Sequence, residues 1–265
     1  MESKKNEFLL SVSQLFDSAW STYKKHFSSI LKINSIPSVI AVLVSSVFVF
    51  IRDISESPLD HSFMVRLQLF AIACVATLVA VVIGSLSYIA QVKLISTNKF
   101  TSLKESFSNS IPYIYAYIVL MVCIGLSVLF GTLLLIVPGV IFAVWFMFAP
   151  LVLITSDTKG IKALKKSKSL VYGIWGPVFF RVIALMAFSL LLSIASNVFI
   201  DFLEKLFSMS ESNAGVIVDL LYQLIVTPFA IVYMYELYTN LVHADTKSNP
   251  IHTSGEGDTV ESTTS

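Results

Sequence analysis

The chain has 265 residues, of which 55% are hydrophobic and only 13% are charged. Soluble domains carry roughly 25% charged residues, so this composition excludes an ordinary globular protein and predicts a chain whose surface meets lipid. The formal net charge of +1 and the lack of a basic block that resembles a nucleic-acid footprint argue against a nucleic-acid partner.

Charged residues divide the chain into apolar runs of the length that membrane helices need. A span takes about 20 apolar residues, because a hydrocarbon core of roughly 30 Å is crossed at about 1.5 Å per residue. Lys32 and Arg52 bound the first run, and Arg66 and Lys93 bound the second, which is long enough to tilt. The runs predict six spans, at about residues 33–51, 67–92, 111–136, 140–155, 177–202 and 215–241.

The third and fourth spans come from one uncharged run between Glu105 and Asp157. A single helix over this run would reach about 75 Å, more than twice the thickness of the hydrocarbon core. We therefore expect the chain to turn back at Pro138 and Gly139, because proline removes a backbone donor and glycine tolerates a turn.

The last two spans carry prolines of their own. Pro177 is a favourable first residue for the fifth span, and Pro228 predicts a kink in the sixth. Residues 246–265 are rich in Ser, Thr, Gly and acidic residues without apolar periodicity, so we expect a disordered cytoplasmic tail there. The preceding residues, 1–245, form one predicted transmembrane domain.

Lysine and arginine residues predict the orientation of the spans. Fourteen of them lie near span ends on the side that holds both termini, and three (Arg52, Arg66 and Lys205) lie on the opposite side. Because cytoplasmic loops are enriched in Lys and Arg, we expect a multi-pass protein of the plasma (inner) membrane with both termini in the cytoplasm.

Three similar amphipathic segments precede the odd-numbered spans, at residues 11–20, 102–110 and 163–172. In the first, Leu15, Ala19 and Tyr23 share one face at helical spacing, which predicts an interfacial helix. In the second, Ser102 and Glu105 have the spacing of a capping box. The predicted fold is an all-α bundle of six transmembrane helices with cytoplasmic interfacial helices, in three helix-plus-hairpin units. Either true internal repeats or the connectors that any polytopic protein needs explain this grouping.

Two pairs of polar residues within the spans are candidates for function, because polar groups are costly in lipid. Arg181 and Glu236 have opposite charges near the cytoplasmic boundary, so we expect either an ion pair between the last two spans or two separately solvated charges. Asn197 and Gln223 lie deeper, and either line a polar path or make hydrogen bonds between packed helices.

Four lysines are predicted to lie on the lipid surface, namely Lys162, Lys165, Lys166 and Lys168. Each cation near an anionic membrane contributes about 1 kcal/mol, which would hold the third amphipathic segment against the headgroups. The topology alone also accounts for a basic segment at this place, because cytoplasmic loops are enriched in lysine.

No catalytic residue, cofactor site or metal site is predicted. The four histidines match no metalloprotease spacing, and the chain contains no phosphate-binding loop, GxGxxG or GxSxG sequence. Cys74 and Cys123 lie in apolar runs, where a thiol packs like a small hydrophobic group, so we expect neither a disulfide nor a metal ligand. These absences argue against an enzyme.

Residues 136–153 and 160–170 contain a Pro-Gly pair, an Ala-Pro pair and an Ala-Leu-x-x-Ser run. They resemble the YciC-like inner-membrane family of prokaryotes and the membrane domain attached to some glycerophosphodiester phosphodiesterases. The matching residues are Pro138, Gly139, Ala149, Pro150, Ala163, Leu164 and Ser167. The resemblance, which extends loosely over about residues 8–245, implies six spans, structural roles for these residues and no established activity. Phosphodiester hydrolysis belongs to a separate soluble barrel in that group, for which we expect no room after Asp245.

These observations together predict a non-enzymatic membrane protein that serves as a scaffold or accessory for envelope or lipid-related processes. Its expected partners are membrane lipids and proteins at the cytoplasmic face. A small permease or lipid transporter is the alternative, favoured by Asn197, Gln223 and the predicted kink at Pro228. A membrane-embedded enzyme is a third hypothesis, which needs several convergent polar side chains at one depth.

Overall fold

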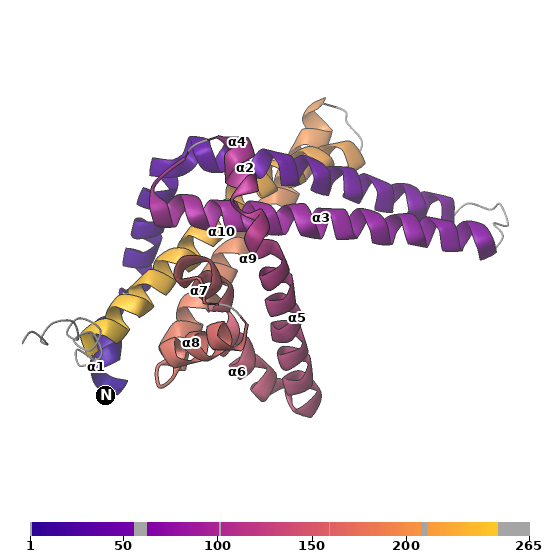
Figure 1. Cartoon of the computed structure of the whole chain (residues 1–265). Coiled ribbons are helices and arrows are strands. Elements are labelled where there is room, and N and C mark those ends of the chain that lie inside the picture. The colour runs from indigo at the N-terminus through magenta and orange to yellow at the C-terminus, as the bar shows by residue number, and fades with distance from the viewer. Residues whose placement is uncertain (1, 56–62, 101, 159, 208–210, 249–265) are drawn as a thin grey trace, which may run out of the picture.

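The structure, a computed structural model, describes residues 2–55, 63–100, 102–158, 160–207 and 211–248. Within these residues every regular element is a helix (Figure 1). The bounds are α1 (Glu2–Glu7), α2 (Val12–Ser55), α3 (Phe63–Thr97), α4 (Leu103–Ser108), α5 (Ile111–Leu134), α6 (Ile136–Phe146), α7 (Ala149–Ser156), α8 (Ile161–Val171), α9 (Trp175–Phe207) and α10 (Glu211–Ser248).

Six helical segments in the described part of the chain are long and apolar enough to cross a membrane: α2, α3, α5, α6 with α7, α9 and α10. The predicted all-α architecture of six membrane helices is therefore confirmed. The fourth segment consists of two short helices, separated at Met147 and Phe148. Pro150 lies in the first turn of α7, where its missing N–H leaves no helical bond unmade.

The α5–α6 hairpin turns at Leu135, so the prediction that the turn lies at Pro138 and Gly139 is wrong. Leu135 has extended backbone angles (φ −165°, ψ 149°), and Pro138 lies in the first turn of α6, where proline is tolerated. Gly139 instead allows close packing, because an added Cβ would lie 2.9 Å from the backbone nitrogen of Thr132 on α5. The physical role of this glycine is helix contact.

The first predicted interfacial segment and the first predicted span form one helix, α2. Ser11 and Gln14 cap it reciprocally, since the Gln14 N–H donates to Ser11 Oγ (3.3 Å) and the Ser11 N–H donates to Gln14 Oε1 (2.9 Å). Nothing between the segment and the span interrupts the helix, and even Pro37 lies within it. In Figure 1, α2 runs first beside α10 and then outward with α3.

The other short helices differ from the predictions at their ends. The start of α4 is confirmed, because Ser102 Oγ accepts a hydrogen bond from the Glu105 N–H at 3.2 Å. Helix α1 was not predicted. Helix α10 continues to Ser248, so residues 246–248 are helical and do not belong to a disordered tail. The rest of the predicted tail, residues 249–265, lies outside the described residues.

Buried side chains concentrate toward one side of the molecule, which we call the base. The base holds α1, α4, α7 and α8, the first half of α2, and the C-terminal ends of α3 and α10. Its core includes the largest fully buried side chains, among them Leu15, Ile30, Ile33, Ile89, Phe148, Leu151, Leu153, Ile174, Tyr233, Leu237 and Leu241.

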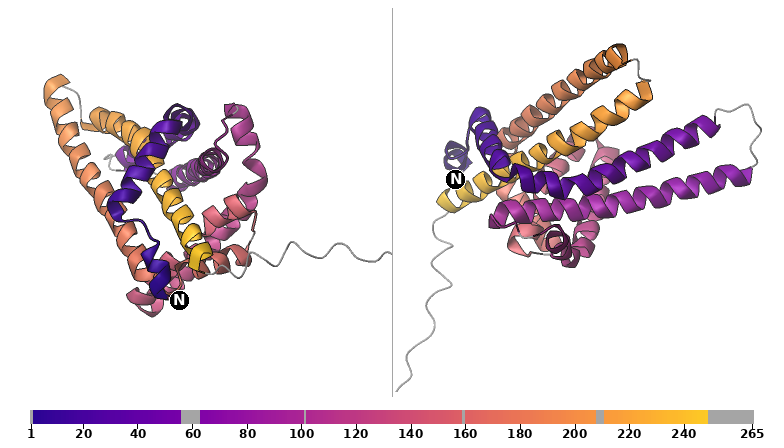
Figure 2. Two further views of the ribbon diagram at one scale, coloured as in Figure 1. Left: turned by 90° about the vertical axis from the view of Figure 1, so that its left-hand side faces the viewer. Right: turned by 90° about the horizontal axis from the view of Figure 1, so that it is seen from above.

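Three helical hairpins, α2–α3, α5–α6 and α9–α10, extend from the base in different directions (Figure 2). Their outer parts expose large apolar side chains, and Leu43, Phe70, Phe130 and Leu191 are each at least 60% exposed. So much exposed apolar surface is unfavourable in water, and it fits a lipid environment.

The two described ends of the chain are joined at the base. Lys5 Nζ is buried, forms an ion pair with Asp245 Oδ1 on α10 at 2.8 Å, and donates to the carbonyl of Ser169 at 3.3 Å. The Leu10 N–H donates to Asn240 Oδ1, also on α10, at 3.0 Å. These bonds fix the N-terminal segment to the C-terminal helix.

The apolar face of the first half of α2 packs into the protein. Leu15 and Ala19 are fully buried, Tyr23 is 2% exposed, and the Tyr23 hydroxyl donates to the Ile225 carbonyl of α10 at 2.9 Å. The inner residues of this face therefore contact protein rather than the headgroup region, whereas Val12 and Phe27 on the same predicted face are 37% and 40% exposed. Helix α10 supplies an apolar partner that cannot be identified from the local pattern of α2.

Candidate functional site

No ion pair joins Arg181 to Glu236 in the described part of the chain, because the arginine has other partners. Arg181 Nε and Nη2 both donate to the Leu10 carbonyl, at 2.9 and 2.6 Å, and Nη1 donates to the Pro177 carbonyl at 2.8 Å. The guanidinium group therefore fixes the segment between α1 and α2 against the start of α9.

Glu236 is bonded instead to the first half of α2. Its two carboxylate oxygens accept hydrogen bonds from Ser18 Oγ at 2.9 Å and from Thr22 Oγ1 at 2.6 Å. Both members of the predicted pair thus anchor the N-terminal part of the chain. The two charged groups do not pair with each other, because neutral groups of the N-terminal segment form hydrogen bonds with each of them.

The two residues of the predicted polar path do not come together. Asn197 is exposed and its side-chain amide donates to the Ser193 carbonyl within its own helix at 2.8 Å. Gln223 lines a cavity between α2, α3 and α10, together with residues such as Asn34 and Gln91. We call this the polar cavity.

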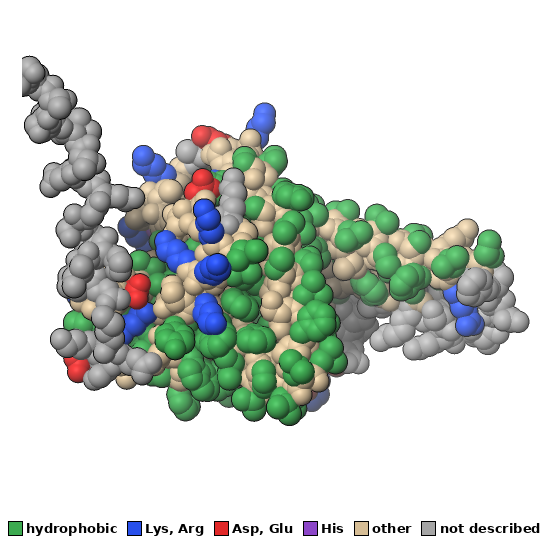
Figure 3. Space-filling view, turned by 60° about the horizontal axis from the view of Figure 1, so that its bottom comes forward, with side chains coloured by type: hydrophobic (Ala, Val, Ile, Leu, Met, Phe, Trp, Pro, Cys, Tyr) green, Lys and Arg blue, Asp and Glu red, His purple; other side chains and the backbone are tan. Residues whose placement is uncertain are grey.

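The lysines of α8 lie on the outer side of an amphipathic helix whose other side is buried. Lys162, Lys165 and Lys166 are exposed, while Lys168 is half-buried with its ammonium group 4.1 Å from the centre of the Trp145 ring. On the opposite face, the buried Ser167 hydroxyl donates to the Trp145 carbonyl at 2.7 Å. Figure 3 shows Lys and Arg side chains gathered on one face beside apolar surface.

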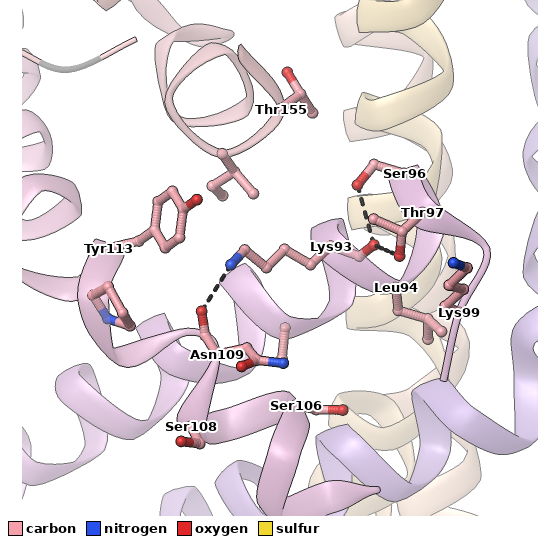
Figure 4. A pocket seen from close by; sticks show the side chains of 13 residues that line it. Lys93, Leu94, Ser96, Thr97, Lys99, Ser106, Ser108, Asn109, Tyr113 and Thr155 are labelled. Atoms are coloured by element: carbon pink, nitrogen blue, oxygen red, sulfur yellow. Dashed lines mark hydrogen bonds between the residues drawn. The ribbon is translucent and has the colours of Figure 1, made fainter. Parts of the chain in front are cut away.

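A second, larger pocket lies at the base between α3, α4, α5 and α7, with a volume of about 900 Å³ (Figure 4). We call it the basic pocket. Its lining contains two ammonium groups, several hydroxyls, an amide and a phenol, and no carboxylate. These polar residues are Lys93, Ser96, Thr97, Lys99, Ser106, Ser108, Asn109, Tyr113 and Thr155.

Lys93 is held in a defined position in the basic pocket. Its Nζ donates to the Asn109 carbonyl at 2.7 Å and lies 3.9 Å from the centre of the Tyr113 ring (Figure 4). An ammonium group has three donors, so further hydrogen bonds remain for a ligand. Lys99, which is exposed, adds a second positive charge to the wall.

Residue type and depth restrict what the basic pocket can bind. Helix α3 ends at Thr97 and α5 begins at Ile111, so the pocket lies at the adjoining ends of two candidate spans. Ammonium and hydroxyl groups suit an anionic, phosphate-like group, and the one carboxylate that acts on Lys93, Asp157, lies outside the lining. No group of three or more His, Cys, Asp or Glu side chains that could hold a metal occurs among the described residues.

The basic pocket was not recognised in the sequence, where Lys93 and Lys99 served only to predict topology. A signal was present in the order Lys93, Ser96, Thr97, which places an ammonium and two hydroxyls on neighbouring turns of one helix. The remaining walls come from α4, α5 and α7, and their approach to α3 is a tertiary feature.

Comparison with known proteins gives a family and no fold relative. A sequence model described as "Uncharacterised protein family (UPF0259)" matches residues 12–240. A UPF0259 membrane protein of Sodalis glossinidius (strain morsitans) is 25% identical over 180 residues, which cover 68% of this chain and 69% of the relative. A UPF0259 membrane protein of Pectobacterium carotovorum subsp. carotovorum (strain PC1) is 27% identical over 131 residues, which cover 49% and 52%. No solved structure matches this chain.

Proposed function

The chain belongs to the UPF0259 family of membrane proteins, and we propose that it is a non-enzymatic protein that binds anionic phospholipid through the basic pocket. In this role it serves as an accessory or scaffold for lipid-related processes of the cell envelope. The observation that carries the proposal is the placement of Lys93 and Lys99 with several hydroxyls in one pocket at the end of two spans.

The chemistry of a phospholipid headgroup fits this lining. A phosphodiester carries one negative charge and several acceptor oxygens, and basic pockets between membrane helices at the cytoplasmic surface bind such groups. The volume of about 900 Å³ is at the upper end of the roughly 300–1,000 Å³ found for small-molecule sites. The pocket therefore has room for a headgroup and the start of its acyl chains.

The orientation with both termini in the cytoplasm is part of the proposal. It places the base, with the basic pocket and the exposed lysines of α8, at the leaflet whose anionic lipids attract lysine and arginine. Lys162, Lys165 and Lys166 then raise the local concentration of anionic lipid without forming a pocket themselves. Protein partners at this cytoplasmic face and the finer likeness to the YciC-like group belong to the same proposal.

The experiment measures which lipids the protein retains. Full-length protein in nanodiscs of equal parts phosphatidylglycerol and phosphatidylcholine is analysed by native mass spectrometry. We expect wild-type protein to retain phosphatidylglycerol preferentially, and the double variant Lys93→Gln/Lys99→Gln to lower that preference about thirtyfold, at about 1 kcal/mol per cation. The matched double variant Lys162→Gln/Lys165→Gln removes the same charge from exposed positions and should lower the preference by a clearly smaller factor, because these lysines do not share a pocket with hydroxyl donors that hold one headgroup.

Two outcomes count against the proposal. An equal loss of preference in both double variants means that attraction is non-specific and that the basic pocket is no site. Release of a hydrolysis product when the purified protein is incubated with phospholipid or a glycerophosphodiester means that the protein is an enzyme.

A small permease or lipid transporter is the second candidate, and the polar cavity at Gln223 favours it. A dithionite assay with fluorescent phosphatidylglycerol in proteoliposomes tests it. Lipid exchange between leaflets that depends on the protein, and slows in a Gln223→Leu variant, supports the transporter. Exchange at the rate of protein-free vesicles supports the accessory.

A further inference from the structure

The polar cavity has a volume of about 360 Å³ and ends in a buried hydrogen-bond network. Asn34 Nδ2 donates to the Gln223 carbonyl and, at 3.4 Å, to Ser38 Oγ. Gln91 Nε2 donates to Asn34 Oδ1 at 3.3 Å and to Ser87 Oγ at 3.1 Å. Protein groups therefore occupy the donors of both buried amides.

One acceptor of this network is unmatched. Gln91 is 1% exposed, and its Oε1 atom has no hydrogen-bond partner among the described residues. Buried polar groups in folded proteins nearly always have a partner, so this atom calls for a donor that enters the cavity. A hydroxyl suits the position in either orientation of the amide, because it both donates and accepts.

The cavity selects against charged ligands. None of its lining residues is charged, and beyond the buried network the lining adds the Gln223 amide, the Thr227 hydroxyl, the Tyr88 phenol and apolar groups. A charge brought into such surroundings would lose its hydration without gaining a partner. The ligand is therefore uncharged and carries at least one hydroxyl.

Polarity changes along two of the three walls in the same direction. On α2 the lining runs from Asn34 to Ala41, and on α3 from Gln91 to Ala80, in each case from polar to apolar with increasing distance from the base, whereas on α10 the apolar Ile231 is nearer the base than Gln223. A lipid of the leaflet next to the base has the same arrangement, with its headgroup toward the base and its chains toward the middle of the membrane. The apolar ends of the α2 and α3 walls, at Ala41 and Ala80, favour such a lipid over a fully hydrophilic polyol.

We propose that the polar cavity binds the hydroxyl headgroup of a neutral lipid of the diacylglycerol class. The hydroxyl bonds to Gln91 Oε1, and the acyl chains leave the cavity past Ala41 and Ala80. Both the ligand class and the binding residues differ from those of the basic pocket, so this site does not depend on the proposed binding of anionic lipid.

Photo-cross-linking tests this site on the full-length protein in nanodiscs. A diacylglycerol analogue with a diazirine near the headgroup end of one chain is irradiated, and labelled peptides are identified by mass spectrometry. We expect label on peptides of α2 and α3, removed by excess dioleoylglycerol and not by phosphatidylglycerol. Gln91→Leu should lower labelling at least about fivefold, because a buried hydrogen bond is lost.

Matched variants keep the test decisive. Gln68→Leu makes the same change at an exposed position of α3 outside both pockets, and should leave labelling unchanged. Thr227→Val removes an exposed rim hydroxyl without touching the buried amides, and should lower labelling about twofold even if Gln91→Leu does not fold. Lys93→Gln/Lys99→Gln should not alter labelling, which separates this site from the basic pocket.

The remaining outcomes are also informative. Competition by glycerol alone would support the hydroxyl site and overturn the lipid as its source. Full labelling in both Gln91→Leu and Thr227→Val would overturn the proposal, and would leave water as the partner of Gln91.

Discussion

The basic pocket and the polar cavity lie on different faces of α3, and each is lined at helical spacing. The polar cavity uses Gly84, Ser87, Tyr88 and Gln91, and the basic pocket uses Ala90, Lys93, Leu94 and Thr97. In each set, residues recur at intervals of three and four, which places them on one side of a helix. One helix therefore separates two sites with different chemistry.

Their difference in charge follows from their surroundings. The basic pocket opens at the base, where Lys93 is half-buried and Lys99 is exposed, so both ammonium groups are accessible to solvent. The polar cavity ends in side chains that are almost fully buried, and it uses amides and hydroxyls only. Depth decides which polar groups a membrane helix can carry at little cost.

Among the changes that test this difference between the two sites, a charge in the polar cavity should have the largest effect on stability. We expect Gln91→Lys to lower the free energy of unfolding by about 3 kcal/mol, because an ammonium group would be buried without a partner. Unfolding in mixed detergent micelles, followed by circular dichroism, measures the change. Gln68→Lys is the control on the same helix, at an exposed position from which lysine can snorkel. A loss below 1 kcal/mol for Gln91→Lys would mean that water reaches the cavity freely.

Salt should separate the two sites with a smaller effect. Raising NaCl from 0.05 to 0.5 M should lower retention of phosphatidylglycerol at the basic pocket several-fold, because the Debye length falls from about 14 to about 4 Å. Cross-linking of the diacylglycerol analogue in the polar cavity should stay within about 1.5-fold, because a neutral hydroxyl is not screened. Parallel losses of both signals would contradict the assignment of charge to one site only.

A change at Glu236 should distinguish the two sites with the smallest effect. Glu236 joins α10 to α2, and both helices line the polar cavity, whereas neither lines the basic pocket. Glu236→Gln should cost about 1 kcal/mol of unfolding free energy, because two charge-assisted hydrogen bonds become neutral ones. It should also lower diacylglycerol labelling about twofold and leave phosphatidylglycerol retention unchanged. Native mass spectrometry and cross-linking of the same preparation check both; an equal effect on the two lipids would contradict this division.

Local patterns predicted the helices well, because length and hydropathy depend on neighbouring residues. The six membrane helices and the start of α4 at Ser102 follow from uncharged runs and from capping chemistry. The turn at Leu135 could not be located in the same way. Proline in the first turn of a helix and proline in a turn give similar sequences, and only the contact between Gly139 and Thr132 shows which applies.

The sites were harder to predict, because residues far apart in the sequence build them. Gln91 meets Asn34 across α2 and α3, and Lys93 meets Tyr113 across α3 and α5. An ion pair between Arg181 and Glu236 was one of two expectations from charge and depth, but Arg181 binds Leu10 and Glu236 binds the first half of α2. Opposite charges on α9 and α10 could not show that the N-terminal segment supplies the hydrogen-bond partners of both.

The bonds between the first residues of the chain and α10 have a consequence for biogenesis. Two of the partners of Lys5 and Leu10, Asp245 and Asn240, lie on α10, so the first half of α2 lacks its main packing surface until α10 has been synthesised. During that time an amphipathic helix rests at the membrane surface, the place that its sequence pattern predicts. We expect a chain stopped before α10 to show fast amide exchange in this half of α2, and the full chain to show slow exchange. The base would then close late, as a final docking step after the spans have been inserted.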